Sequence, residues 1–587
     1  MQNNERYSNA QNIQWDKRHL FIVSAGLLLF YLVLYLLPLG QRPLTYPDEV
    51  RYAEIPREML TSGNWVVPHL DGLRYFEKPP LAYWANAIAI SLFGENDFAV
   101  RLPSALASGL TTLLLFIFTL RTTLNTRVAL SAALIHMTMM AVYVVSTVNT
   151  PDNLLTFFLS AGIVLFFFAS EADRNRTGPQ SLWWFSGLFF GLAFLTKGFL
   201  AFAIPFLVLV PWMLWNGHQR LLLSKAWPVI AAAALVIMPW SLLIYLQEKD
   251  FWHYFFWIEH IRRFTADDAQ HREPFYFFLM YLPVLLFPWF NLIPAAVRGL
   301  FIKYKKNDND INQHQLSSIR LAWLWFLLPF LFFSVSKGKL LTYILPCLPA
   351  IAFLSATGLF YYFEGRKKLF NAGILFNTLI FFGLLTGLSY NLSLDNGSHI
   401  YALDENDRIT ILVVALITGV VAGLVAFYNK QPVIKLAANT AMITPLLFAL
   451  PFVLPEQAIE LKSPGAILQQ YKNQVTSDTL IISDGNVIRA VDWYFDRDNV
   501  YLISPGELDY GLSYPDAQYK LLNREQFAAL MASSVQRPIL MACNPTCDEN
   551  FSKLLPATAK NQVWGDFEIW QYNLKSDDLT SLKKPQL

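Results

Sequence analysis

An acidic pair, Asp48 and Glu49, directly follows Pro47. Proline suits the first turn of a helix and the helix dipole stabilises carboxylates there, so this spacing predicts a helix that begins at the pair. Asp48, Arg51 and Tyr52 then share one face of that helix. Such a face can orient a charged substrate or supply a base. A solvated, capped helix with local ion pairs is the competing interpretation.

A second charged pair, Glu77 and Lys78, precedes a stretch from 79 to 94 that contains no charge. This stretch is aromatic, begins with two prolines and is short for a membrane span, so it predicts a helix that lies in the membrane interface. The pair could contact an anionic head group there. Alternatively, both residues extend their charged ends to water from an interfacial position.

An aromatic segment, 251–264, contains His253 and His260, two α-helical turns apart. Its aromatic residues favour another interfacial helix, and the spacing puts both histidines on one side. A histidine together with a carboxylate such as Glu77 could hold a divalent metal, which makes Glu77 and His260 the metal candidates. Interfacial hydrogen bonding is the alternative.

Cations recur next to the apolar runs. Arg262 and Arg263 offer planar forks that bind phosphate in a bidentate way, whereas lysines offer point charges. The lysines in such positions are Lys78, Lys197, Lys337 and Lys339. Carboxylates and cations gathered among aromatic interfacial helices suit a site for an amphiphile with an anionic head.

The composition excludes a soluble globular protein. Of the 587 residues, 54% are hydrophobic and only 15% are charged, whereas roughly 25% is ordinary for soluble chains. The net charge is +2 and no basic block occurs, which excludes the electrostatic signature of a nucleic-acid partner. Cys543 and Cys547 are close enough in sequence for a local bridge, but we interpret them as ordinary residues.

Thirteen stretches predict membrane spans, because a helix needs about 20 apolar residues to cross about 30 Å of hydrocarbon. They are 20–39, 102–120, 129–151, 153–170, 181–196, 198–217, 226–247, 274–297, 321–336, 340–363, 369–394, 409–429 and 436–455. Arginine and lysine concentrate in alternate connections, so the positive-inside rule puts the long loops 41–101 and 248–273 outside, together with residues 456–587. We expect these two loops to form the active site.

The last part of the chain, 456–587, changes composition. Short apolar stretches such as 480–482 and 500–503 lie between Asp, Gly and Pro residues, which predicts strands separated by turns. We therefore expect a transmembrane catalytic domain over 1–455, followed by a small soluble α/β domain.

Seven motifs carry a resemblance to a known family. They are residues 46–55, 68–79, 196–200, 251–264, 267–272, 336–345 and 507–517. Together they closely resemble ArnT, the lipid A aminoarabinose transferases within the GT-C membrane glycosyltransferases, which are relatives of the protein O-mannosyltransferases. The likeness covers nearly the whole chain. The acidic pair alone is common among GT-C enzymes, whereas the combination of motifs is far more specific.

The resemblance implies a polytopic α-helical GT-C fold with about 13 transmembrane helices, interfacial helices and a periplasmic C-terminal α/β domain, in the bacterial inner membrane. It implies inverting transfer of 4-amino-4-deoxy-L-arabinose from undecaprenyl phosphate to lipid A phosphates, which lowers surface charge and gives polymyxin resistance. Asp48 matches the family's essential aspartate and Asp152 its acidic residue in a helix turn; Glu77 and Lys78 match its metal and donor-phosphate contacts. No organic cofactor is implied, and we expect a monomer among membrane lipids.

The reaction assigns further roles. Breaking a glycosyl-phosphate bond builds positive charge on the sugar and negative charge on the phosphate, and both must be stabilised. The candidates for the phosphate are Lys78, Arg262, Arg263, Lys337 and Lys339. Either Asp152 or Glu49 could pair with the sugar's ammonium group. Further substrate contacts are expected from Arg51, Tyr52, Tyr75, Lys197, His253 and Tyr343.

Two other functions stay open. A polyprenyl-phosphate-sugar transferase that acts on protein or glycan hydroxyls would need Asp48 as a general base, whereas a phosphate acceptor would need Asp48 only to orient it or to stabilise the oxocarbenium. A transporter would put its ionisable groups near the bilayer midplane on discontinuous helices. The predicted spans contain very few charges at mid-depth, so transport ranks second to transfer.

Overall fold

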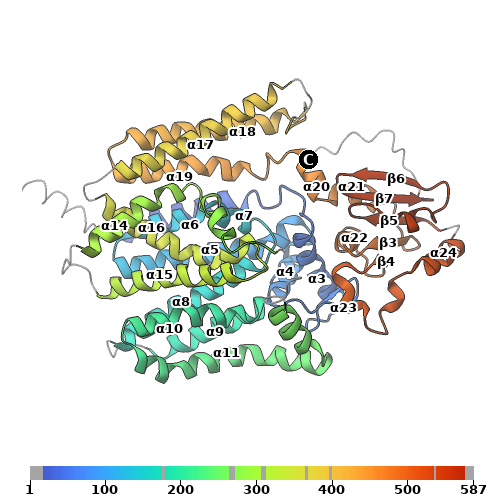
Figure 1. Cartoon of the computed structure of the whole chain (residues 1–587), viewed down its shortest axis with the longest axis horizontal. Helices are drawn as coiled ribbons and strands as arrows, with labels where there is room; N and C mark the ends of the chain where they lie inside the picture. The colour runs from blue at the N-terminus through green and yellow to red at the C-terminus, as the bar shows by residue number, and fades with distance from the viewer. Residues whose placement is uncertain are drawn as a thin grey trace, which may run out of the picture. The chain divides into compact units, whose positions relative to one another are not determined.

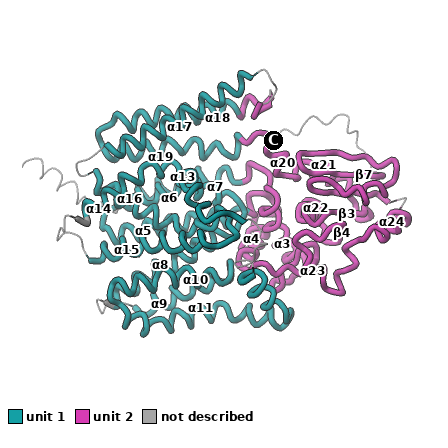
Figure 2. The backbone as a smooth tube through the Cα atoms, viewed as in Figure 1, with its two compact units in different colours: residues 1–39, 101–397, 409–453 teal, residues 40–100, 398–408, 454–587 magenta. Residues whose placement is uncertain are grey.

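The structure is a computed structural model that describes residues 17–174, 179–262, 272–305, 313–363, 368–394, 399–402, 404–534 and 537–574. The chain forms two compact units, coloured separately in Figure 2. Unit 1 comprises Met1–Leu39, Arg101–Gly397 and Ile409–Val453, and unit 2 comprises Gly40–Val100, Ser398–Arg408 and Leu454–Leu587. The first long loop therefore belongs to the same unit as the C-terminal residues.

The described elements of unit 1 are helices (Figure 1). They are α2 (Lys17–Tyr31), η1 (Leu32–Leu36), α5 (Asp97–Thr123, whose first turn is in unit 2), α6 (Thr126–Met137), α7 (Met140–Ser146), α8 (Asp152–Arg174), α9 (Ser181–Lys197), α10 (Leu200–Trp215), α11 (Gln219–Gln247), η2 (His253–Arg262), α13 (Phe277–Leu285), η3 (Phe290–Leu292), α14 (Ile293–Lys305), α15 (Gln313–Val335), η4 (Leu341–Cys347), α16 (Leu348–Tyr362), α17 (Lys368–Leu392), α18 (Asn406–Tyr428, whose first residues are in unit 2) and α19 (Pro432–Ala449).

Each of the thirteen predicted spans falls on helix in the described residues. Eight helices are long and apolar enough to cross a membrane, and two bent pairs, α6 with α7 at 60° and α13 with α14 at 94°, raise that number to 10. The other three predicted spans fall on shorter helices, namely α2 with η1, α9 and α10. The protein is thus a multi-pass membrane protein, and the count of thirteen stays a prediction.

Helices α14 and α16 cross at two glycines. A Cβ on Gly299 would lie 1.9 Å from the carbonyl oxygen of Gly358, and a Cβ on Gly358 would lie 2.2 Å from that of Ala296. Only glycine allows this approach, which is how small residues bring membrane helices together. On α11, by contrast, apolar side chains such as Leu235 and Leu246 are 65% and 72% exposed, as suits contact with lipid tails.

Unit 2 combines helices with two sheets (Figure 1). Its elements are α3 (Asp48–Ser62), β1 (His69–Leu70), β2 (Leu73–Arg74), α4 (Leu81–Phe93), α20 (Glu456–Lys462), α21 (Gly465–Lys472), β3 (Leu480–Asp484), α22 (Ile488–Phe495), β4 (Tyr501–Ser504), η5 (Gly506–Leu508), α23 (Asp509–Leu512), η6 (Gln518–Lys520), α24 (Arg524–Ser533), β5 (Ile539–Cys543), α25 (Glu549–Ser552), β6 (Lys560–Trp564) and β7 (Phe567–Tyr572).

The larger sheet has the order β4-β3-β5-β7-β6. Strands β4, β3 and β5 run parallel, whereas β7 pairs antiparallel with both β5 and β6. Strands β3 and β5 are buried at every position, as expected for the centre of a sheet covered on both faces. The strands predicted at 480–482 and 500–503 are confirmed. Helices α3 and α22 share one hydrophobic core, which includes Val50 and Val491.

The interpretation of Cys543 and Cys547 as ordinary residues is wrong. The two cysteines form a disulfide, with their Cα atoms 5.1 Å apart. Both lie in a core that also contains Phe551, because the chain turns back directly after β5. Sequence separation alone could not distinguish this turn from an extended segment.

Candidate active site

The first turn of α3 carries the predicted acidic pair. Asp48 is the first residue of the helix and its side chain is 49% exposed. Arg51 lies one turn further along α3, and one of its terminal nitrogens forms an ion pair with Asp48, as the predicted shared face requires. The carboxylate is therefore accessible to a substrate and oriented by a buried guanidinium.

Arg51 also contacts residues from two other segments. Its second terminal nitrogen donates to Glu507 at 2.6 Å and to Tyr75 at 2.9 Å, and lies 3.7 Å from Glu77. The guanidinium lies over the ring of Tyr52, 5.5 Å from its centroid. The guanidinium of Arg51 thus connects Asp48 to Tyr75 in the first loop and to Glu507 in the C-terminal part of unit 2.

Glu507, at the start of η5, is the main partner of this arginine. It also pairs with Arg489 of α22 at 3.2 Å. Burial would raise the pKa of Glu507, but Arg51 and Arg489 outweigh it and lower the pKa below its ordinary value. The carboxylate stays ionised and anchors both cations. Glu507 was not predicted as a site residue, although it begins one of the motifs that carry the resemblance.

Glu49 has a different environment from its neighbour Asp48. It is fully buried, and one carboxylate oxygen accepts from Arg42 at 2.6 Å and from the backbone and hydroxyl of Thr45 at 2.8 Å each. These contacts tie the start of α3 to the preceding loop. The geometry therefore supports a structural role for Glu49 more than contact with a sugar.

The remaining first-loop candidates lie around this centre. Lys78 donates to the backbone oxygen of Glu77 at 2.9 Å and lies 3.8 Å from its carboxylate. Tyr52 stacks on Tyr83 of α4 with ring centroids 5.7 Å apart, and its backbone oxygen accepts from Asn86. Helix α4 is the short apolar helix predicted for this loop.

In unit 1, three predicted site residues meet at the ends of helices. Lys197, the last residue of α9, pairs with Asp152, the first residue of α8, at 2.5 Å. The ammonium group of Lys197 lies 4.9 Å from the ring centroid of Tyr343 in η4. A carboxylate at a helix N-terminus and a cation at a helix C-terminus are each favoured by the helix dipole. This is a second charged centre in which an anionic or aminated group could bind.

The turn before η4 is joined to the end of the second loop. The backbone N–H of Glu273 donates to the backbone oxygen of Lys337. The ammonium group of Lys339 donates to the backbone oxygen of Glu273, at 2.6 Å, and to that of Ser336. Lys339 is buried and Lys337 half-buried. Lys339 thus secures the turn.

The second aromatic segment is a π-helix, η2. The expectation that His253 and His260 share a side assumed α-helical winding, and is wrong for that reason. His260 packs against the rings of Phe199 and Phe255, and its Nδ1 lies 2.7 Å from the backbone oxygen of Phe255. His253 and Arg262 are exposed. The predicted residue Arg263 lies outside the described residues, and so do residues 267–271 of the motif at 267–272.

The two predicted metal ligands lie in different units. Glu77 belongs to unit 2 and His260 to unit 1, and their pairing stays a prediction. The bond from Nδ1 to a carbonyl is the kind that fixes a metal-binding tautomer of histidine, so the donor types fit. A group of three carboxylates with ligand spacing, Glu54, Glu58 and Asp492, was not predicted.

Two protein families match the chain. Residues 20–255 match dolichyl-phosphate-mannose-protein mannosyltransferase, and residues 459–571 match the C-terminal domain of arabinosyl transferase ArnT. The solved structure of ArnT from Cupriavidus metallidurans bound to undecaprenyl phosphate has a TM-score of 0.76 at 21% identity, covering 97% of this chain and 99% of that chain.

Curated relatives match at higher identity. The undecaprenyl phosphate-alpha-4-amino-4-deoxy-L-arabinose arabinosyl transferase of Aeromonas salmonicida is 38% identical over 510 residues, which are 86% of this chain and 91% of the relative. The protein of the same name from Erwinia tasmaniensis is 35% identical over 557 residues, or 93% and 98% of the two chains.

The fold is that of the GT-C membrane glycosyltransferases, as predicted. Within that class, the chain belongs to the family of undecaprenyl phosphate-alpha-4-amino-4-deoxy-L-arabinose arabinosyl transferases, ArnT. The chain is accordingly a glycosyltransferase that uses a lipid-linked sugar, and the resemblance inferred from its motifs is confirmed.

Proposed function

We propose that this enzyme transfers 4-amino-4-deoxy-L-arabinose from undecaprenyl phosphate to a phosphate group of lipid A, at the periplasmic face of the inner membrane and with inversion. The observation that carries the proposal is the match over 510 residues to a relative named for this donor. Such a modification adds a positive charge to each lipid A that receives it. It would lower the affinity of the cell surface for polymyxin and other cationic peptides.

Asp48 is the proposed catalytic group. A lipid A phosphate monoester is mostly ionised at neutral pH, because its second pKa is about 6. It therefore needs no general base, and Asp48 instead orients the acceptor or stabilises positive charge on the sugar. The ion pair with Arg51 sets the direction of the carboxylate, and Glu507 holds Arg51 in place. Both are positioning residues for Asp48.

The departing undecaprenyl phosphate needs cations. We assign this role to Lys78, Lys337 and the exposed Arg262, with Arg263 as a further candidate. Asp152 and Lys197 form the group that would receive the sugar's ammonium or a phosphate, since either charge finds a partner there. Tyr75, Tyr343 and His253 complete the proposed substrate contacts.

A bound divalent metal at Glu77 and His260 belongs to the same proposal. It would supply positive charge next to a phosphate when present. Glu77 is 17% exposed beside Lys78, so its carboxylate is accessible. Metal content of the purified protein, compared with that of Glu77→Ala and His260→Ala, tests this assignment; equal content in all three would remove it.

The acceptor is tested with purified donor and enzyme. Intact lipid A and lipid A dephosphorylated at both positions are offered as acceptors, and transfer is followed by mass spectrometry. We expect sugar only on the phosphorylated molecule. Transfer to dephosphorylated lipid A at the same rate would instead favour a hydroxyl acceptor, the reaction suggested by the family match of residues 20–255.

The same assay tests the proposed catalytic group with the variant Asp48→Asn. Its matched control is Asp509→Asn, which changes an exposed acidic residue at the start of α23.

A further inference from the structure

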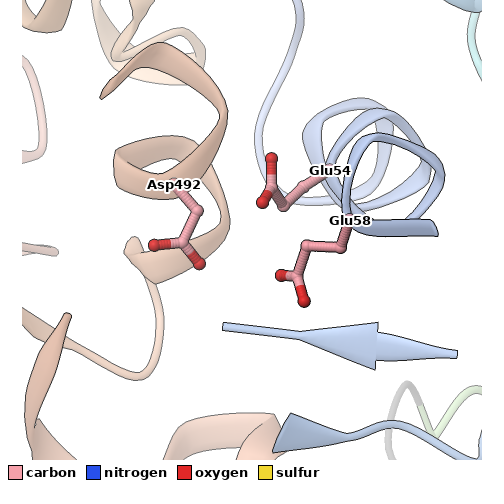
Figure 3. Close-up of side chains that lie close together, drawn as sticks. All are labelled: Glu54, Glu58 and Asp492. Atoms are coloured by element: carbon pink, nitrogen blue, oxygen red, sulfur yellow. The ribbon is translucent and has the colours of Figure 1, made fainter. Parts of the chain in front are cut away.

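A buried acidic cluster lies between α3 and α22 in unit 2 (Figure 3). Glu54 and Glu58 are one turn apart on α3, and Asp492 faces them from α22. Glu54 and Asp492 are fully buried and Glu58 is 4% exposed. One carboxylate oxygen from each lies within 4.8 Å of the others. The cluster is separate from the Asp48 centre, although the same helix carries both.

Two of the three carboxylates have protein partners. Glu54 forms a bidentate pair with Arg57 at 2.6 and 2.8 Å, and Glu58 accepts the backbone N–H groups of Asp71 and Gly72 at 2.6 and 3.0 Å. Each of their oxygens keeps a second lone pair for another partner. These contacts hold the two side chains in fixed directions toward α22.

Asp492 has no such partner among the described residues. Both of its carboxylate oxygens are buried without a hydrogen bond, and so is one oxygen of the neighbouring Asp71. Burying an unpartnered carboxylate is costly, and such groups in folded proteins bind a proton, a water molecule or a cation. The unpartnered carboxylate of Asp492 therefore indicates that the cluster binds a ligand.

The charge balance indicates what that ligand is. Four buried carboxylates, Glu54, Glu58, Asp71 and Asp492, are opposed by two buried cations, Arg57 and Lys520. Two negative charges remain. One divalent cation would neutralise them.

We propose that Glu54, Glu58 and Asp492 bind a divalent cation with oxygen ligands, Ca²⁺, which fastens α3 to α22. Ca²⁺ bonds oxygen at 2.3–2.6 Å, so two oxygens bound to one ion lie at most about 5 Å apart, and one oxygen from each residue of the cluster lies within 4.8 Å of the others. The absence of nitrogen and sulfur donors disfavours Zn²⁺. Mg²⁺ demands stricter octahedral geometry and keeps several waters, which suits a fully buried cluster less well.

The competing occupant is a proton. Burial raises the pKa of Glu58 to about 7 and that of Asp492 well above its ordinary value, so Asp492 could carry a proton and donate it to a glutamate. One substitution, Asp492→Asn, distinguishes a bound cation from a bound proton. An asparagine at 492 imitates a protonated aspartate because its amide donates hydrogen bonds, whereas it is a poor replacement for a charged metal ligand.

The test uses the full-length protein in detergent, stripped with EDTA and then given Ca²⁺ or Mg²⁺ alone. We expect Ca²⁺ to raise the Tm of the wild type by several degrees, because a ligand that binds only the folded state stabilises it. Asp492→Asn should have a lower Tm than the Ca²⁺-loaded wild type and should not respond to Ca²⁺. Asp496→Asn, at the exposed end of the same helix and in a left-handed conformation that asparagine tolerates, should respond like the wild type.

A second measurement remains informative if Asp492→Asn does not fold. Tb³⁺ replaces Ca²⁺ at oxygen sites, and the buried Trp493 next to Asp492 should sensitise its luminescence. We expect this signal to be displaced by Ca²⁺ and lost in Glu58→Gln. A wild type whose Tm responds to neither cation, or an Asp492→Asn protein as stable as the Ca²⁺-loaded wild type, would overturn the proposal in favour of the proton. A response to Mg²⁺ but not Ca²⁺ would overturn the assignment of Ca²⁺.

Discussion

Replacing Arg51 with lysine tests whether this residue positions the catalytic carboxylate. The guanidinium contacts Asp48 with one terminal nitrogen, and Tyr75 and Glu507 with the other. A lysine ammonium keeps the charge but is a single point at the end of a flexible chain, so it cannot contact both sides at once. We expect it to stay with the more buried Glu507 and to release Asp48.

The expected decrease in kcat follows from the contacts that Arg51→Lys loses. The ion pair with the half-exposed Asp48 contributes roughly 0.2–1 kcal/mol. The buried charged hydrogen bond to Tyr75 contributes about 1.5–3 kcal/mol. Their loss amounts to roughly 2–4 kcal/mol. If all of it is expressed in the transition state, kcat falls about 30- to 1000-fold, at about 1.4 kcal/mol for each factor of ten.

The assay measures kcat and KM separately with purified donor and lipid A, together with the Tm. We expect Arg51→Lys to lower kcat far more than it changes KM, because Asp48 is displaced while the cations that bind the donor stay. Arg57→Lys is the matched control. It weakens another arginine of α3, paired with Glu54, and should lower the Tm while leaving kcat unchanged below the unfolding temperature.

An Arg51→Lys protein with the wild-type kcat and an unchanged Tm would show that Arg51 does not position Asp48. A double substitution gives a second check. Residues that act through one another have non-additive effects, so Arg51→Lys combined with Glu507→Gln should reduce kcat by less than the product of the two single effects. Full additivity would mean that Glu507 does not act through Arg51.

Asp48→Asn keeps the volume of the side chain but loses its charge, so it should fold normally and lose transfer; wild-type transfer by the folded variant would eliminate Asp48 as the catalytic group. Lys197→Met leaves the buried Asp152 unpaired, at a cost of about 3–5 kcal/mol, and adding Asp152→Asn should restore the Tm but not transfer. Because its arginine partners lower the pKa of Glu507 below 4.5, its contribution to stability should be constant above about pH 4.5 and be lost as the pH falls below that value. The Tm difference between wild type and Glu507→Gln should therefore shrink in acid, and a constant difference would contradict the ion pairs. A cysteine at the exposed Ser477 should react with a membrane-impermeant reagent from the periplasmic side, whereas labelling from the cytoplasm alone would reverse the proposed orientation.

Local sequence determined the features that depend on near neighbours along the chain. Apolar length predicted where the membrane helices lie, because each turn of a helix must be apolar to face lipid. The spacing of Asp48 and Arg51 predicted their ion pair, since residues three apart meet on one helix face. Alternation of apolar stretches and turn residues predicted β3 and β4. The motifs, taken together, identified the family.

Tertiary structure alone decided which distant residues meet. Glu507 reaches Arg51 across 456 positions, and Asp492 faces Glu54 and Glu58 although no spacing in the sequence relates the two helices. The bond between Cys543 and Cys547 depended on the turn after β5, which leaves both side chains buried in one core. Short-range patterns report the periodicity of one element, whereas these contacts arise when two elements bury a common core. Such a contact gives Arg51 its counter-charge, because Glu507 of η5 lies 2.6 Å from a nitrogen of the Arg51 guanidinium.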